Sequence, residues 1–107
     1  MIDSSIKRIA EQLSVCYEEA YNVYRPQVKM IIRNKIKDVN YIEHTLDGCL
    51  DIYTDKGFYL FMELLLYYRK VNYKNAREYL EIAKEERKDE YKDFVKKIKK
   101  IKGSKKE

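Results

Sequence analysis

The chain has 107 residues, which suits one domain, and its 3 glycines and 1 proline leave few positions for tight turns. This composition excludes collagen-like, low-complexity and disulfide-rich scaffold proteins, and it argues against a β-sandwich with many hairpins. The net charge of +5 is uneven, because residues 96–107 carry seven lysines and one glutamate while residues 1–95 are close to neutral. We therefore expect a helical domain over residues 1–95, followed by a lysine-rich helical extension and disordered tail over residues 96–107.

Signals for export or membrane insertion are missing from the sequence. Cys16 and Cys49 are the 2 cysteines, whereas a small secreted domain usually carries more, in pairs. The first residues lack a basic flank followed by an apolar run. The longest apolar stretch, residues 57–68, is shorter than the roughly 20 residues that cross a bilayer. We expect a cytoplasmic protein with no integral membrane association.

Residues 2–23 carry a single apolar stripe that predicts one long helix. Apolar residues recur there at alternating spacings of four and three, which fits either a core-facing helix or the seam of a coiled coil. The stripe covers only about three heptads, so we favour the core-facing helix, with a break or kink at Pro26 because proline lacks a backbone N–H. The stripe consists of Ile2, Ile6, Ile9, Leu13, Cys16, Ala20 and Val23.

Residues 26–39 and 40–53 predict two helices that pack as an antiparallel hairpin. Pro26 suits the first position of a helix, and Asn40 with Glu43 three residues later resembles a capping box. If the chain turns near Asn40, the apolar positions of the two helices face one another, and a basic stripe faces an acidic one. An exposed pair contributes about 0.2–1 kcal/mol, so such pairs set register more than stability. The predicted pairs are Lys37–Glu43, Arg33–Asp47, Lys29–Asp51 and Arg25–Asp55.

Residues 58–70 predict the central helix, because apolar residues lie on nearly every side of it. Asn72 caps the next helix, which either runs unbroken to about residue 102 or bends near Lys88–Asp89. Residues 103–107 are expected to lack regular structure. The predicted fold is therefore an all-α compact bundle of five to six helices around residues 58–70, with the hairpin turn near Asn40.

A pattern of helix residues extends over positions 40–85: the segment 42–51 (IEHTLDGCLD), then Tyr67-Tyr68, Asn72, Ala76 and Tyr79. This pattern resembles a group of short proteins encoded on conjugative and related mobile elements of Gram-positive bacteria. Members of that group more usually carry an aromatic-Cys pair and a Cys-Arg pair, where this chain has Ile52-Tyr53 and Leu65-Leu66. The resemblance implies a helical accessory protein of a mobile element, and it implies no active site.

No combination of residues assembles a catalytic or metal site in the sequence. His44 is the only histidine, and although Asp47 and Asp51 share its helix face, the paired spacings of metal sites are missing. Cys16 and Cys49 fall on apolar faces, which favours buried thiols over reactive ones. A glycine-rich phosphate loop is missing as well. We expect a protein that is not an enzyme and that holds no cofactor and no metal.

The lysine-rich end is the candidate nucleic-acid surface, since clustered lysines bind phosphates in a salt-dependent way. Ile98 and Ile101 keep an apolar stripe among these lysines, so the segment also suits a protein partner or an anionic membrane surface. A solvated helix end is the third interpretation. The candidate contacts are Lys96, Lys97, Lys99, Lys100, Lys102, Lys105 and Lys106.

Tyrosine is unusually abundant, at 11 residues. It is enriched at interfaces, and a small domain has difficulty covering an all-round apolar helix by itself; codon bias and ordinary core edges explain the tyrosines equally well. We expect a non-enzymatic protein-interaction module with a protein partner or a second copy, and as the alternative a nucleic-acid-binding accessory protein. The candidate interface residues are Tyr17, Tyr21, Tyr24, Tyr59, Tyr67 and Tyr68.

Overall fold

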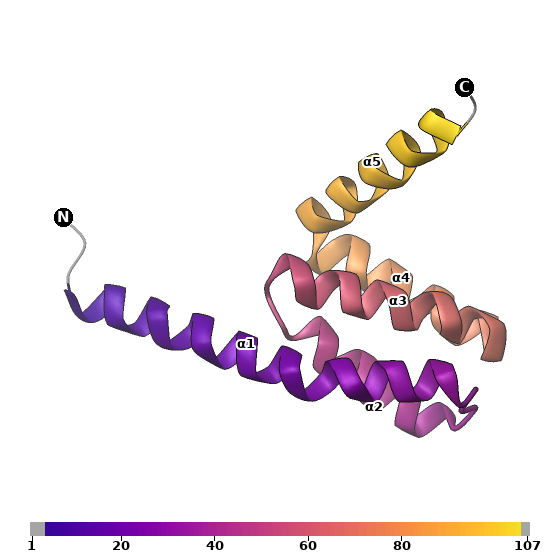
Figure 1. The fold of residues 1–107 in the computed structure, drawn as a ribbon, viewed down its shortest axis with the longest axis horizontal. Helices are drawn as coiled ribbons and strands as arrows, with labels where there is room; N and C mark the ends of the chain where they lie inside the picture. The colour runs from indigo at the N-terminus through magenta and orange to yellow at the C-terminus, as the bar shows by residue number, and fades with distance from the viewer. Residues whose placement is uncertain (1–3, 106–107) are drawn as a thin grey trace.

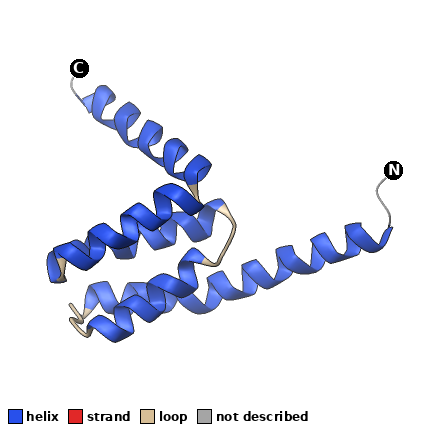
Figure 2. Cartoon of the chain, turned by 180° about the vertical axis from the view of Figure 1, so that it is seen from behind, coloured by secondary structure: helices blue, strands red, loops and turns tan. Residues whose placement is uncertain are grey.

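Five helices make up the part of the chain that this computed structural model describes, which is residues 4–105 for the backbone and 5–100 for the side chains. They are α1 (Ser4–Arg33), α2 (Val39–Leu50), α3 (Asp55–Val71), α4 (Tyr73–Glu86) and α5 (Lys88–Lys105) (Figure 1). No strand occurs among the described residues (Figure 2). The predicted all-α fold is confirmed.

α3 is the central helix, as predicted. It packs against each of the other four helices, and its side chains Phe58, Phe61 and Leu64 are fully buried. Burial on several sides explains why apolar residues surround this helix in the sequence. Within the described residues, no helix combines the length and the apolar character needed to cross a membrane.

Pro26 lies inside α1, so the predicted break is wrong and residues 26–39 do not form a separate helix. A proline in a helix interior costs about 3 kcal/mol, because it removes one hydrogen bond and crowds the preceding turn. The residues on either side of it are held by the core: Tyr24 packs against the core before the proline, and Val28 and Ile31 are fully buried after it. Tertiary packing therefore outweighs the local penalty.

α1 ends in a tight turn that no residue pattern in the sequence predicts. The backbone N–H of Ile36 donates to the carbonyl of Ile31 at 3.0 Å, and the N–H of Lys35 donates to that of Ile32 at 3.3 Å. This pairing is the Schellman motif, which places one residue in the left-handed region. Lys35 occupies that position with a φ of 54°. The motif reverses the chain and begins the hairpin.

α2 begins at a different cap from the one predicted. The Asp38 carboxylate accepts a hydrogen bond from the N–H of Tyr41 at 3.2 Å, so Asp38 is the N-cap and Asn40 is already helical. The antiparallel hairpin of α1 and α2 is present (Figure 1), with its turn over residues 34–38. A carboxylate accepts the free N–H groups of a helix start as well as an amide does, so Asp38 takes the role that was predicted for Asn40.

Replacing Lys35 with glycine is expected to raise the free energy of unfolding by about 0.5–1 kcal/mol, because glycine adopts a positive φ without a Cβ penalty. Denaturant titration of both chains measures the difference. Lys37→Gly is the matched control: Lys37 is exposed and has no positive φ, so this change is expected to be neutral or destabilising. Equal stabilisation by both substitutions would contradict a role for the left-handed backbone.

None of the four predicted ion pairs across the hairpin forms within the described residues, so that prediction is wrong. A tyrosine of α3 and a tyrosine of α4 reach Glu43 and Asp47 instead, while Asp51 stays exposed. Two of the four carboxylates therefore accept hydrogen bonds from tyrosines. The contacts that replace the predicted ones are Lys29–Glu63 at 2.8 Å, Tyr68–Glu43 at 2.5 Å and Tyr79–Asp47 at 2.9 Å.

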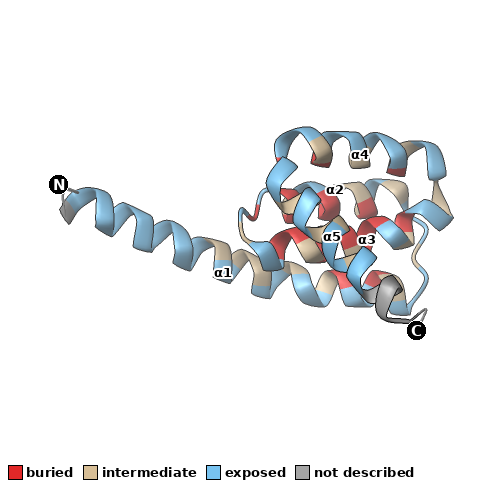
Figure 3. Cartoon of the chain, turned by 90° about the horizontal axis from the view of Figure 1, so that it is seen from above, coloured by how far each residue is buried: buried red, intermediate tan, exposed pale blue. Residues whose placement is uncertain are grey.

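The N-terminal half of α1 projects away from the other helices, with its residues exposed (Figures 1 and 3). The prediction that its apolar stripe faces the core is wrong, because a different stripe that includes Val28 and Ile31 packs there. Ile2, also part of the predicted stripe, lies outside the described residues. We name the exposed apolar stripe the α1 seam; it consists of Ile6, Ile9, Leu13, Cys16 and Val23.

α4 and α5 meet at Arg87, so residues 72–102 form two helices that bend next to the predicted Lys88–Asp89. Arg87 leaves helical geometry at φ −124° and ψ 47°. Asn72 is the N-cap of α4, as predicted, and its side chain accepts from the N–H of Asn75 at 3.0 Å. α5 extends to Lys105, into the segment 103–107 for which no regular structure was expected; residues 106–107 lie outside the described residues.

Candidate functional site

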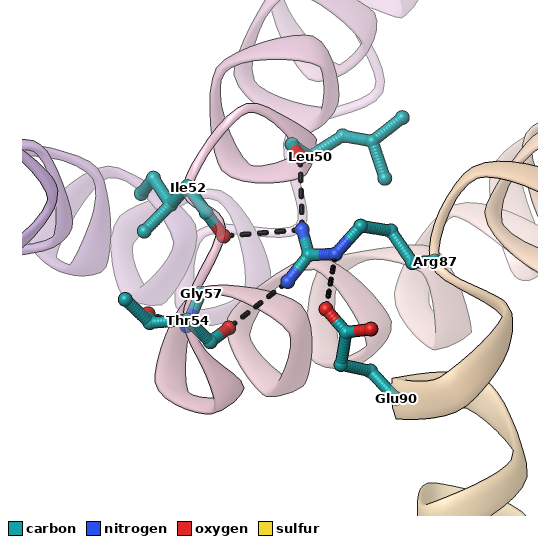
Figure 4. Close-up of polar contacts among 6 residues, drawn as sticks. All are labelled: Leu50, Ile52, Thr54, Gly57, Arg87 and Glu90. Atoms are coloured by element: carbon teal, nitrogen blue, oxygen red, sulfur yellow. Dashed lines mark hydrogen bonds and ion pairs between the residues drawn. The ribbon is translucent and has the colours of Figure 1, made fainter. Parts of the chain in front are cut away.

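Arg87 fixes the joint between α4 and α5 from inside the fold, since it is only 1% exposed. Its Nη1 donates to the carbonyls of Leu50 at 2.9 Å and Ile52 at 3.1 Å, and its Nη2 donates to that of Thr54 at 3.1 Å (Figure 4). Its Nε donates to Glu90 at 2.6 Å. The last carbonyls of a helix lack partners within the helix, so this guanidinium satisfies the end of α2 and the loop that follows it.

Two aromatic rings and one carboxylate surround the guanidinium of Arg87. Its central carbon lies 4.9 Å from the ring centroid of Tyr53 and 5.4 Å from that of Phe58, and a cation over an aromatic face is attracted by it. Burial by itself would raise the pKa of Glu90, but the hydrogen bond and the charge of Arg87 hold that pKa below its usual range. Glu90 is therefore charged at neutral pH.

The loop from α2 to α3 passes close to the start of α3. Thr54 accepts a hydrogen bond from the N–H of Gly57 at 3.1 Å and thereby caps α3. A Cβ at Gly57 would lie 2.5 Å from the carbonyl oxygen of Ile52, so only glycine permits this approach without a shift. The loop is thus held at the position where Arg87 reaches its carbonyls.

α5 leaves the joint across α3 and is held there by side-chain contacts. The Phe94 ring lies 6.2 Å from that of Phe58 and 5.8 Å from that of Tyr59, centroid to centroid. Lys97 Nζ donates to the Tyr59 hydroxyl at 2.5 Å. Together with Arg87, these contacts set the angle at which α5 diverges from α4 (Figure 1).

This divergence opens an apolar groove of about 370 Å³ between α3, α4 and α5. Its floor includes the buried side chains Met62, Leu65 and Ala76, while Leu66 and Tyr73 are 48% and 61% exposed. The groove therefore presents apolar surface that the chain itself leaves uncovered. It is lined by Met62, Leu65, Leu66 and Arg69 from α3, by Tyr73, Ala76, Arg77 and Leu80 from α4, and by Tyr91, Phe94, Val95 and Ile98 from α5.

Among the described residues that line the groove, the charged ones are both arginines, Arg69 and Arg77, and none is a carboxylate, a histidine or a cysteine. The described lining therefore places no nucleophile beside a base. An apolar cleft with positive charge at its edge can bury apolar side chains and attract negative charge.

The predicted nucleic-acid contacts with described side chains are all exposed: Lys96, Lys97, Lys99 and Lys100. Lys97 bonds to Tyr59 and Asp93, and these bonds raise its pKa. Lys88 and Lys92 are exposed as well and precede Lys96 and Lys99 at helical spacing, so α5 carries one basic face. The side chains outside the described residues are Lys102, Lys105 and Lys106.

The six tyrosines predicted as interface residues contact other parts of the same chain. Tyr68 is fully buried and lies on no surface, whereas the other five are half-buried. They tie neighbouring segments together, so the exposed apolar surface is made by other residues. Their partners are Tyr53 for Tyr17, Lys56 for Tyr21, Gly48 for Tyr24, Phe94 and Lys97 for Tyr59, the Ile36 carbonyl for Tyr67 and Glu43 for Tyr68.

The two cysteines lie in opposite environments. Cys49 is fully buried, and burial raises the pKa of its thiol to about 12. Cys16 is exposed on α1, so the prediction that it is buried is wrong. His44 and Asp47 are exposed on α2. Across the described residues, no group of three or more histidines, cysteines and carboxylates is placed to hold a metal ion.

Neither the groove nor the arginine that positions it is predicted from the sequence. The sequence does contain a signal for an uncovered surface, because the consecutive leucines at 64–66 place apolar side chains on more sides of α3 than a domain of this size can cover. No local signal marks Arg87, which lies in a run of charged residues from Lys84 to Glu90. Its burial depends on the end of α2, 37 residues away along the chain.

The chain was also compared with known proteins. Comparison with protein-family models, with curated proteins and with solved structures finds no match.

Proposed function

We propose that this chain is a non-enzymatic helical protein-interaction module that binds an amphipathic helix with acidic flanks in the apolar groove. The observation that carries the proposal is the composition of the groove: a buried apolar floor, an exposed apolar edge, and two arginines with no carboxylate among the described lining residues. Grooves of this kind accept the apolar face of a partner helix in several recognition modules.

The spacing of the lining residues supports a helical ligand. Met62, Leu66 and Arg69 on α3 follow at i, i+4 and i+7, and Tyr73, Arg77 and Leu80 on α4 repeat that spacing. Each set forms a ridge about 10 Å long at 1.5 Å per residue, which matches two turns of a bound helix. Each ridge carries one arginine, so a bound helix would meet positive charge from both α3 and α4.

The biological setting is part of the same proposal. The resemblance of residues 40–85 to short proteins of mobile elements supports an accessory role there. An accessory protein that acts by binding needs an uncovered recognition surface and no catalytic residues, which agrees with the lining of the groove.

Leu66→Glu is expected to weaken helix binding at least tenfold, about 1.4 kcal/mol, because it places a charge on the apolar edge of the groove. The probe is a fluorescein-labelled amphipathic peptide with leucines at i, i+3, i+4 and i+7, made in glutamate-flanked and lysine-flanked forms. Fluorescence anisotropy measures each Kd. The natural chain is expected to prefer the glutamate-flanked form, and Arg69→Gln with Arg77→Gln is expected to remove that preference.

Ile82→Glu is the matched control, since Ile82 is a 40% exposed apolar residue of α4 that does not line the groove. It is expected to leave both Kd values unchanged. Failure of the glutamate-flanked peptide to bind the natural chain would overturn the proposed ligand. Equal weakening by Leu66→Glu and Ile82→Glu would show that the peptide binds elsewhere.

The second candidate function, nucleic-acid binding, is favoured by the basic face of α5. Four exposed lysines lie along it, and within the described part of the chain no acidic side chain from another helix forms a salt bridge with them: Lys88, Lys92, Lys96 and Lys99. Such a face neutralises phosphates and releases counterions, so affinity falls steeply with salt.

Fluorescence anisotropy on a random DNA duplex across a salt series tests this second function. The variant with Lys92→Gln, Lys96→Gln and Lys99→Gln is expected to lose most of the affinity and of the salt dependence. The control with Lys35→Gln, Lys37→Gln and Lys70→Gln removes equal charge from other exposed positions. Equal losses from both variants would indicate attraction to net charge and no dedicated surface.

A further inference from the structure

The α1 seam is an apolar surface that nothing in the described part of the chain covers. Ile6, Ile9 and Val23 are 57–60% exposed, and Leu13 is 48% exposed. A single helix in water gains nothing from a continuous apolar stripe of this kind, whereas a second helix packed along it would bury the stripe. The alternating spacing of four and three is the spacing of a coiled-coil seam.

We propose that a second copy of this chain packs antiparallel along the α1 seam to form a two-helix coiled coil. A seam on one helix face is self-complementary under a twofold axis, so the same residues serve both copies. The positions that flank the seam raise no charge barrier, because Ala10, Gln12 and Tyr17 are uncharged and Glu19 lies near Gln12 of the second copy in an antiparallel pair. This inference concerns a different surface from the groove and does not depend on its ligand.

The charges of α1 favour the antiparallel arrangement. Arg8 lies near the start of the projecting segment, and Glu19, about three turns later, lies on the same side of the seam. In an antiparallel pair with the register described below, Arg8 of each copy lies within about one turn of Glu19 of the other, whereas a parallel pair leaves them about three turns apart. Opposite charges beside a seam help to set the orientation of a coiled coil.

One antiparallel register uses every described residue of the seam. In that register, Leu13 lies at the level of Cys16 of the second copy, and Ile6 lies at the level of Val23 of the second copy. Ala20, half-buried between Cys16 and Val23, faces Ile9. Each layer then pairs two side chains, as coiled-coil packing requires.

Sedimentation equilibrium of the full chain over a concentration series tests the pairing. The natural chain is expected to be a dimer, and Ile9→Glu is expected to raise the dissociation constant at least about tenfold. Val15→Glu is the matched control: Val15 is 56% exposed, against 57% for Ile9, and lies on α1 outside the seam, so its effect should stay below about threefold. Circular dichroism checks that all three chains keep the same helix content.

Three results would overturn the proposal: a natural chain that stays monomeric at the highest concentration, equal weakening by Ile9→Glu and Val15→Glu, or a dimer that Leu66→Glu breaks and Ile9→Glu does not. The last result would place the contact in the groove. Because peptide binding to the groove is measured separately, a failure of the seam is distinguishable from a failure of the proposed function.

Cysteine cross-linking tests the orientation. Two chains are prepared with Cys16→Ser, one also carrying Ile6→Cys and the other Val23→Cys; Cys49 is fully buried and does not compete. Oxidation of the mixture is expected to join the two different chains, because the required Cβ–Cβ distance of about 4 Å arises between those positions. Cross-links between like chains alone, or none in a persistent dimer, would overturn the antiparallel register.

Discussion

Replacing Arg87 with methionine is expected to lower the free energy of unfolding by about 3–5 kcal/mol. Methionine keeps much of the side-chain volume but removes every donor, which leaves the carbonyls of Leu50, Ile52 and Thr54 without the partner that Arg87 supplies. A domain of this size is stable by about 5–15 kcal/mol, so the loss is a large fraction of the total. Denaturant titration measures it, and the melting temperature should fall by about 15 °C or more.

Two further variants separate the hydrogen-bonding geometry of the Arg87 guanidinium from its charge. Arg87→Lys keeps the charge but offers a single ammonium group, so it is expected to recover only part of the stability. Lys88→Ala changes the adjacent exposed residue and should stay within about 0.5 kcal/mol of the natural chain. If Arg87→Lys were as stable as the natural chain, the planar arrangement of the four hydrogen bonds would not matter.

Glu90 makes the stability provided by Arg87 depend on pH in the acid range. Its pKa is lowered in the folded chain, so the pair with Arg87 stabilises the fold above the ordinary pKa of a glutamate and is lost as the pH falls through the lowered value. In Arg87→Met the Glu90 carboxylate has lost its partner. The part of the acid-induced loss of stability that comes from protonation of Glu90 should therefore be absent in this variant. An unchanged pH dependence in that variant would contradict the pairing.

The parts of the fold that the sequence predicts are those with local signals. The apolar surroundings of residues 58–70 require burial on several sides whatever the neighbours are, and Asn72 caps a helix through its own side chain. Pro26 shows the limit of such signals: its local preference ends a helix, but the burial of Val28 and Ile31 carries the helix through it. Contacts distant in sequence decided that outcome.

The predicted ion pairs failed for a related reason. Equal spacing of charges on two helices shows that they can be brought level, but it does not show which helix covers the acidic side of α2. Tyr68 and Tyr79 come from α3 and α4 and reach Glu43 and Asp47 first. A hydroxyl at the edge of the core bonds to a nearby carboxylate at little cost in side-chain entropy, whereas a long lysine or arginine must be ordered to do so.

In the candidate site, too, features with a local sequence signal were predictable and features that depend on distant contacts were not. The apolar excess on α3 indicates an uncovered surface, and Leu66 at the edge of the groove is its visible part. The direction of α5, which opens the groove, depends on Arg87 reaching the end of α2, and no pattern within residues 84–90 distinguishes this arginine from its solvated neighbours. The apolar stripe of α1 was recognised, but whether it faces the core depends on how far the helix extends beyond the body.

Tyr68→Ala is expected to lower the free energy of unfolding by about 3–5 kcal/mol, because it removes a fully buried ring next to the central core. Tyr68→Phe keeps the ring and removes only the hydroxyl, which donates to Glu43 at 2.5 Å, so it should cost about 1–2 kcal/mol. Asn75 Nδ2 still donates to Glu43 at 3.1 Å in that variant. A double-mutant cycle with Glu43→Gln isolates the bond, and purely additive losses would show that the two groups do not interact.

The dependence of stability on pH above 10 tests the same hydroxyl independently. Burial first, and then the bond to Glu43, raises the pKa of Tyr68 to about 12, against an ordinary value of about 10 in the unfolded chain. The neutral hydroxyl therefore stabilises the fold below pH ~10, and that contribution is lost as the pH rises from about 10 through 12. Denaturant titration from pH 10 to 12 is expected to show a smaller loss of unfolding free energy for Tyr68→Phe than for the natural chain. Tyr73→Phe, at a 61% exposed position, should follow the natural chain. Identical pH dependence of the two variants would mean that the fold does not keep the Tyr68 hydroxyl neutral.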